Sequence, residues 1–86
     1  MNLMNTTTID DALEKGYPIF VTFKTDTKEI VAWYPFGEKL AQGEAESRCA
    51  KNGPDTYESA PWERYVFIRD KYEKHLRQLE EIERRL

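Results

Sequence analysis

The sequence predicts one small α+β domain that spans residues 1–86. Two runs rich in β-branched and aromatic residues flank a polar turn, a pattern typical of a β-hairpin. Two longer segments follow, and both show the three-to-four-residue apolar spacing of helices. Hydrophobic residues make up 40% and charged residues 34% of the chain, which is a globular composition. A chain of this size can bury only one shallow core.

The N-terminal part is expected to contain a flexible arm, residues 1–7, and then a short helix. Thr8 followed three residues later by Asp11 is a helix-start pattern, because a threonine side chain can accept a backbone N–H of the first turn. Gly16 is placed to end this helix after about two turns. The first residues carry neither the basic start nor the apolar run of an export signal.

Residues 17–34 are expected to form an antiparallel β-hairpin. Its strands are Tyr17–Lys24 and Glu29–Tyr34, and the polar segment Thr25–Lys28 forms the turn. Apolar side chains fall on both faces, because the side chains of a strand alternate between its two faces. We therefore expect a sheet that is covered on both faces, or covered on one face and offered to a partner on the other.

The middle segment Glu38–Lys51 is expected to be a helix, since it lacks β-branched residues and an Asn-Gly-Pro stop follows it. Ala41, Ala45 and Cys49 recur every four residues with Leu40 beside them, so these side chains should face the sheet. Small side chains on that face would let the helix lie close to the sheet.

The remainder of the chain is expected to form a long C-terminal helix. Asn52–Ser59 would be a connector, with Ser59 as the helix cap and Pro61 in the first turn, where a missing N–H has no cost. No glycine or proline follows up to Leu86. Residues 65–69 leave an alternative open, because their apolar run also suits a third strand of the sheet.

Apolar residues on this helix follow a heptad-like spacing of three and four. A helix over residues 60–86 would be about 40 Å long, whereas a compact globule of this size spans about 30 Å. Its last turns would then project and need a partner helix, which predicts a homodimer or a hetero-complex. If the helix instead starts near Asp70 after a third strand, the stripe packs on the protein's own sheet, and both alternatives stay open. The predicted interface residues are Tyr65, Ile68, Tyr72, His75, Leu76, Leu79, Ile82 and Leu86.

The sequence shows no recognisable catalytic, metal or cofactor motif. His75 is the one histidine, and no carboxylate lies three or four residues from it to orient its ring. The one cysteine, Cys49, lies among alanines and suits core packing better than nucleophilic chemistry. Zinc spacings, calcium loops and glycine-rich phosphate loops are absent from the sequence. We therefore expect a non-enzymatic protein that needs no cofactor.

Charge, cysteine content and aromatic residues indicate the compartment and the class of partner. One cysteine permits no intrachain disulfide and no segment is long and apolar enough for a membrane span, so we expect a cytoplasmic protein without membrane contact. The formal net charge of −3 argues against a nucleic-acid partner. Aromatic residues dominate many protein interfaces, and Tyr34, Tyr57 and Trp62 lie near predicted loops as binding candidates.

These observations predict a small protein-binding module that acts stoichiometrically, as an inhibitor or adaptor of a larger protein. Compact acidic proteins of this kind are common among phage-encoded inhibitors of host factors, so a viral origin is suggested by analogy of size and charge. The alternative is a homo-oligomer that binds a small ligand or nucleotide between its subunits. In that case Trp62 and Tyr65 would stack on the base, and Arg64 or Arg69 would bind the phosphate.

Overall fold

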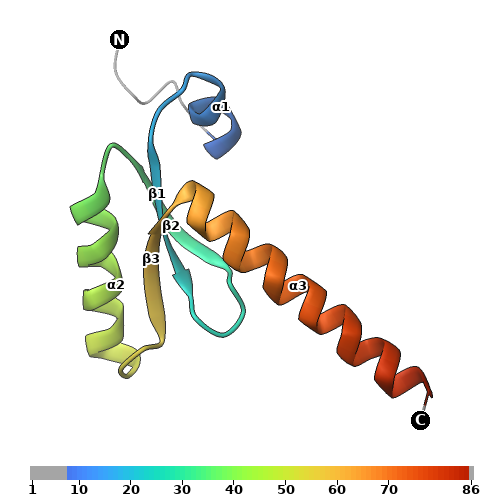
Figure 1. Ribbon diagram of the computed structural model, residues 1–86. Coiled ribbons are helices and arrows are strands. Elements are labelled where there is room, and N and C mark those ends of the chain that lie inside the picture. Colours follow the sequence, from blue (N-terminus) through green and yellow to red (C-terminus); the bar gives the residue numbers. More distant parts are fainter. Residues whose placement is uncertain (1–7, 86) are drawn as a thin grey trace.

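The computed structural model describes residues 8–85 and confirms the predicted α+β class (Figure 1). The chain forms a short helix, a hairpin, a middle helix, a third strand and a long C-terminal helix. The predicted arm, residues 1–7, lies outside the described residues. The elements are α1 (Ile9–Glu14), β1 (Ile19–Lys24), β2 (Ile30–Pro35), α2 (Glu38–Asn52), β3 (Tyr57–Pro61) and α3 (Trp62–Arg85).

Helix α1 begins and ends where the sequence predicts. The Thr8 side chain accepts the backbone N–H of Asp11 at 3.1 Å, which satisfies one of the free donors of the first turn. The helix ends before Gly16, whose φ of 77° lies in the left-handed region that favours glycine. Ala12 is fully buried and joins α1 to the hydrophobic core.

Strand β1 is the centre of a three-stranded antiparallel sheet with the order β2-β1-β3. Strands β1 and β2 form the predicted hairpin, in which Val21 lies opposite Trp33. Strand β3 pairs with the other edge of β1, where Ala60 lies opposite Val21. The third strand is therefore residues 57–61. Its suggested place at residues 65–69 was wrong, because those residues are helical.

The third strand lies in the segment that was expected to be a connector. Ser59 pairs with Thr22 in the sheet and does not cap the following helix. The residues of β3 give little sign of a strand, since Ala60 is its one buried residue and Glu58 is exposed. The strand forms because β1 has a second edge, whose buried backbone groups need hydrogen-bond partners.

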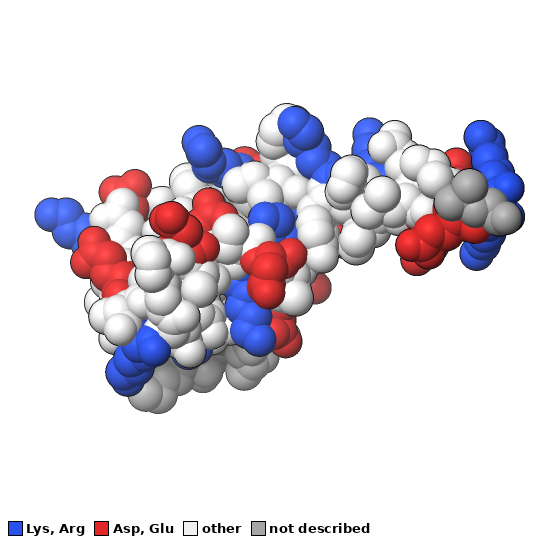
Figure 2. Space-filling model, turned by 90° about the horizontal axis from the view of Figure 1, so that it is seen from below, with Lys and Arg blue, Asp and Glu red and all other residues white. Residues whose placement is uncertain are grey.

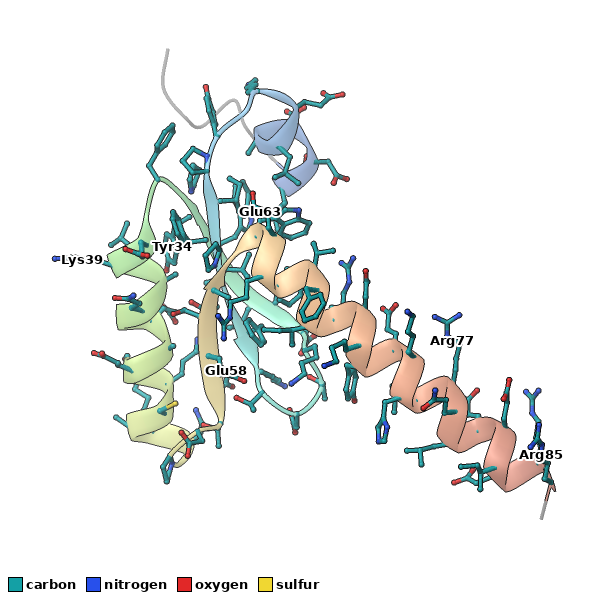
Figure 3. All side chains as sticks on the ribbon, viewed as in Figure 1. Tyr34, Lys39, Glu58, Glu63, Arg77 and Arg85 are labelled. Carbon is teal, nitrogen blue, oxygen red and sulfur yellow. The ribbon has the colours of Figure 1, made fainter. Side chains whose placement is uncertain are left out.

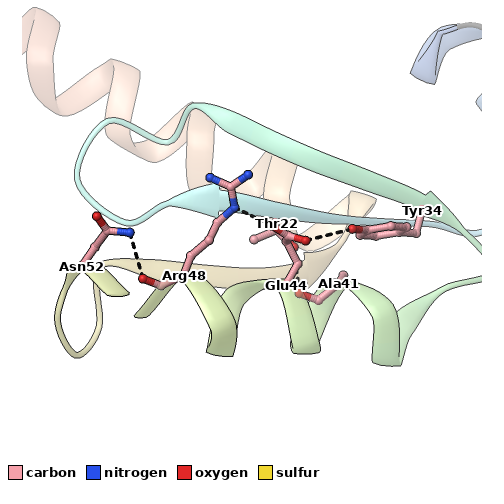
Figure 4. Close-up of polar contacts among 6 residues, drawn as sticks. All are labelled: Thr22, Tyr34, Ala41, Glu44, Arg48 and Asn52. Carbon is pink, nitrogen blue, oxygen red and sulfur yellow. Dashed lines mark hydrogen bonds and ion pairs between the residues drawn. The ribbon is translucent and has the colours of Figure 1, made fainter. Parts of the chain in front are cut away.

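Both faces of the sheet are covered within the chain, which was the first of the two predicted alternatives. Helix α2 covers one face, while α1 and α3 lie on the other (Figure 1). On the α2 side, the buried hydroxyl of Thr22 donates a hydrogen bond to the carbonyl oxygen of Ala41 at 2.7 Å (Figure 4). Ile19, Val21 and Phe23 alternate onto the opposite side and are buried there in the core.

Helix α2 lies close to the sheet through small side chains. Ala41 and Ala45 are buried, as predicted, and Cys49 is half-buried. Leu40 was expected on this inward face, but it is 63% exposed. Its side chain points about 100° around the helix from that of Ala41. The close approach of the alanines therefore leaves Leu40 at the side of the helix, in solvent.

Helix α3 is a single helix that begins directly after β3, and Tyr65 fixes it to the sheet. The Tyr65 side chain is only 3% exposed, and its ring meets the ring of Phe23 with centroids 5.0 Å apart. Its hydroxyl donates a hydrogen bond of 2.6 Å to the carbonyl oxygen of Lys28. Val66 and Ile68 are partly buried against the same core. These contacts tie the start of α3 to the turn between β1 and β2.

Each edge strand of the sheet ends in a proline. Pro35 is the last residue of β2 and Pro61 the last residue of β3, both at the end of the sheet where β1 begins. In each edge strand, the residues next to the proline form the backbone hydrogen bonds to β1. The backbone nitrogen of the proline therefore faces away from β1, toward the open edge of the sheet. Proline has no N–H, so neither edge offers a backbone donor at this position.

Replacing Tyr65 by phenylalanine should lower the free energy of unfolding by about 1 kcal/mol, because the ring remains and the hydrogen bond to Lys28 is lost. Tyr72→Phe is the matched control, since Tyr72 meets Lys28 through its ring, with the Lys28 Nζ 5.7 Å from the ring centroid. Urea unfolding followed by circular dichroism measures both variants. Equal effects of the two substitutions would contradict this role of the Tyr65 hydroxyl.

Candidate functional site

The main surface feature is the part of α3 that extends beyond the sheet, residues 73–85, which we call the projecting segment. Every residue in it is exposed, and Tyr72 is the last half-buried residue before it. Figure 1 shows this segment running past the β1–β2 turn into solvent. The elongated shape, 56 Å by 32 Å by 17 Å, follows from this projection.

Three large apolar side chains lie along one side of the projecting segment. Leu76, Leu79 and Ile82 are 41%, 44% and 55% exposed, and we call this set the α3 stripe. Their spacing of three residues keeps them on neighbouring positions of one helix side. Figure 2 shows uncharged surface on this segment between the body and the charged tip. Single exposed apolar residues are ordinary, but an adjacent set on one helix is a candidate docking surface.

The other predicted interface residues divide between the core and solvent. Tyr65 is buried and Ile68 partly buried, so both face the protein's own sheet. Tyr72 is half-buried at the boundary, and His75 is exposed beside the stripe. Leu86 lies outside the described residues. The predicted line of apolar residues therefore changes from buried to exposed at Tyr72.

The three aromatic binding candidates are all half-buried. Trp62 packs against the core, with its ring centroid 5.7 Å from that of Tyr65. Tyr57 lies beside Arg48, whose guanidinium carbon is 5.4 Å from the ring centroid. Tyr34 lies under α2 and donates a hydrogen bond of 3.3 Å to Glu44 Oε1 (Figures 3 and 4). These aromatic side chains are thus engaged within the fold.

The residues named for nucleotide binding all lie in the first turns of α3, where their exposure ranges from buried to exposed. The rings of Trp62 and Tyr65 lie against each other, with centroids 5.7 Å apart, and Trp62 packs against the core to which Tyr65 belongs. The Arg69 guanidinium carbon lies 5.7 Å from the centroid of the Tyr65 ring, and Arg64 is exposed. This alternative places its pocket between subunits, so it stays a prediction.

A charged network joins α2 to β2. The Arg48 Nε donates a hydrogen bond of 2.6 Å to Glu44 Oε2, and the hydroxyl of Tyr34 donates to the other oxygen of the same carboxylate (Figure 4). The hydrogen bond from Arg48 is the main reason that the pKa of Glu44 lies below its usual value. Burial, followed by the nearby Glu44 charge, raises the pKa of Tyr34. The network holds α2 in place, and it lies apart from the α3 stripe.

Surface hollows occur elsewhere on the body. One lies between the β1–β2 turn and the α2–β3 loop, and its lining includes Thr25 and Thr56. Another lies between α2 and β3 and includes Cys49, whose Sγ donates to the Tyr57 carbonyl oxygen at 3.4 Å. His75 lies on the projecting segment, far along α3 from these hollows. Within residues 8–85, no group of three or more His, Cys, Asp or Glu side chains is placed to hold a metal ion.

The structure also exposes Phe36, which lies between β2 and α2 and which the sequence patterns did not mark. Phe36 is 62% exposed, and Leu40 in the first turn of α2 is exposed to the same extent. Phe36 has a φ of 60°, an uncommon backbone conformation for a residue other than glycine. Its ring lies 5.3 Å from the ring of Tyr17, measured between centroids. The Pro-Phe-Gly sequence at the end of the strand is the signal that could have marked this position.

Replacing Arg48 by glutamine should raise the pKa of Glu44 toward its ordinary value, because the main cause of the depression is removed. Lys51→Gln is the control and should raise it less, since Lys51 acts on Glu44 only through space. A carboxyl whose pKa is lowered by folding stabilises the fold above its ordinary pKa, and this stability is lost as the pH falls. NMR titration of the Glu44 side chain measures the effect, and an unchanged pKa in Arg48→Gln would refute it.

Within residues 8–85, no helix combines the length and the apolar character that crossing a bilayer requires. Comparison of the sequence with protein-family models and with curated proteins, and of the chain with solved structures, found no match.

Proposed function

We propose that this protein is a non-enzymatic protein-binding module that acts stoichiometrically through the α3 stripe. The observation that supports this proposal is the exposure of Leu76, Leu79 and Ile82 on a helical segment whose residues are all exposed. A helix that presents apolar residues at this spacing suits a partner helix or a hydrophobic groove. A protein of this kind inhibits a larger protein by covering part of it, or joins two proteins as an adaptor.

The energetics of the stripe favour a helical partner. Fully burying a leucine or isoleucine stabilises by about 1.5 to 3 kcal/mol, and the stripe residues are about half exposed. Covering all three would contribute about 2 to 4 kcal/mol, whereas association costs about 4 to 15 kcal/mol in lost freedom of motion. The partner must therefore add apolar residues of its own, as a second amphipathic helix does.

The charged residues of the projecting segment support its stability as a helix in water. Glu80 with Arg84 and Glu81 with Arg85 are acid-first pairs four residues apart, and each contributes about 0.2 to 0.5 kcal/mol. The segment can therefore stay helical before a partner arrives, which lowers the entropic cost of binding. We place this activity in the cytoplasm, where the lone thiol of Cys49 stays reduced.

Replacing Leu79 and Ile82 together by glutamine should abolish partner binding, because it removes most of the apolar surface of the stripe. The matched control is Arg77→Gln with Arg84→Gln, which changes two residues on the opposite side of the same segment. Affinity capture from a cell lysate, read by mass spectrometry, compares each variant with the native chain. Capture of the same proteins by the Leu79 and Ile82 double variant and by the native chain would overturn the proposal.

Removing residues 76–86 should leave the melting temperature of the body within about 3 °C at low concentration, because the projecting segment is exposed throughout. The same truncation should remove partner binding. Thermal unfolding followed by circular dichroism measures the first effect, and affinity capture the second. A truncated chain that still binds its partners would place the interface on the body.

A further inference from the structure

The charges along α3 change sign between its base and its tip. The base, residues 64–74, carries four cations and two carboxylates, a net charge of +2. The tip, residues 80–85, carries three carboxylates and two arginines, a net charge of −1. A second copy in antiparallel orientation brings the tip of each helix beside the base of the other, whereas a parallel copy brings base beside base. Charge complementarity therefore favours two antiparallel α3 helices.

We propose that the α3 stripe binds a second copy of this chain, with the two α3 helices antiparallel; this inference rests on the protein-binding function proposed above. When the heptads are aligned, Leu79 of one copy faces His75 of the second copy. Ile82 of one copy then faces Tyr72 of the second copy, and the two Leu76 side chains meet near the twofold axis. Because this contact uses the same surface on both chains, the assembly closes at two copies.

Glu83 and Arg69 make the contact that is specific to this register. Each lies one heptad from Leu76, on the same side of the stripe. Within residues 8–85, Glu83 has no cation three or four residues away along the helix, whereas Glu80 and Glu81 each have an arginine four residues later. Antiparallel pairing about Leu76 places Glu83 of each copy beside Arg69 of the other. The pairing thus gives Glu83 a cationic neighbour in the other chain.

Tyr72 and Arg69 are half-buried, so part of each side chain stays open to a second copy. The sheet and the β1–β2 turn cover α3 as far as Tyr72, and the exposed stripe begins beyond it. In the antiparallel pair, each body lies beside the tip of the other chain, so the two bodies stand at opposite ends. Lys28, whose Nζ lies 5.7 Å from the centroid of the Tyr72 ring, adds a cation near the place where the acidic tip arrives.

Disulfide trapping tests the direction of the two helices. In a Cys49→Ser background, His75→Cys and Leu79→Cys are prepared separately and then oxidised with diamide, alone and as a mixture. Antiparallel pairing predicts a mixed disulfide dimer in the mixture and little covalent dimer of either variant alone. Parallel pairing places identical residues opposite each other, so covalent dimers of each variant alone would overturn the inference. Arg77→Cys is the control and should not cross-link, since its side chain points away from the β1–β2 turn (Figure 3).

A charge exchange tests the register without a cross-link. Arg69→Glu or Glu83→Arg alone should raise the dimer dissociation constant about three- to tenfold, because each places like charges side by side in both symmetric contacts. The double variant should return it to within about twofold of the native value. Sedimentation equilibrium of the full chain measures these constants, and circular dichroism checks that each variant is folded. If the double variant has a dissociation constant as high as those of the single variants, the proposed register is overturned.

The outcomes separate this inference from the proposed function. A native chain that remains monomeric at concentrations up to about 1 mM overturns self-pairing. If such a chain still captures other proteins, and loses them when Leu79 and Ile82 are replaced by glutamine, the proposed function survives. If neither self-pairing nor stripe-dependent capture is found, both proposals fail.

Discussion

Helix α3 is longer than the sheet on which it packs, and both the elongated shape and the exposed α3 stripe follow from this mismatch. Its 24 residues extend about 36 Å, whereas a six-residue strand of the sheet extends about 20 Å. A helix satisfies most of its own backbone hydrogen bonds, so it can leave the body and remain folded in water. Only the side chains of the projecting segment then lack neighbours, and the apolar ones are the α3 stripe.

The base of α3 turns this projection into a defined surface. Tyr65 is buried against Phe23, and its hydroxyl binds the carbonyl oxygen of Lys28. Lys28 also lies over the ring of Tyr72, so one residue of the β1–β2 turn contacts α3 at two successive places. Two contacts fix the direction of a helix better than one. A surface held in a fixed direction loses less freedom when it binds, which favours association.

Local patterns in the sequence predicted most of the fold. The Thr8 cap, the hairpin and both long helices follow from turn residues and apolar spacing, which act within a few residues. Strand β3 was missed because it depends on pairing with β1, more than thirty residues earlier, and its own residues include Ser59, Glu58 and Pro61. The exposure of Leu40 likewise depends on how closely α2 approaches the sheet, which no local pattern encodes.

The candidate site was predictable in its residues but not in its limits. The spacing of Leu76, Leu79 and Ile82 indicates one apolar side of a helix, whether or not a sheet covers it. Which part of that side stays free depends on where the sheet ends beneath α3, and the structure places that limit at Tyr72. The sequence pattern therefore includes Tyr65 and Ile68 in the same line of apolar residues, although both pack against the hydrophobic core of the body.

The prolines that end β2 and β3 affect how copies of this protein can meet. An open three-stranded sheet has two edges, and unprotected edges let molecules join strand to strand into fibrils. Pro35 and Pro61 have no backbone N–H to donate to a carbonyl oxygen of an incoming strand. The hydrogen bonds between the strands would therefore be interrupted at either edge of the sheet. Strand-by-strand stacking is thereby discouraged at this end of the molecule, and contact between copies is left to side chains, which can tell one partner from another.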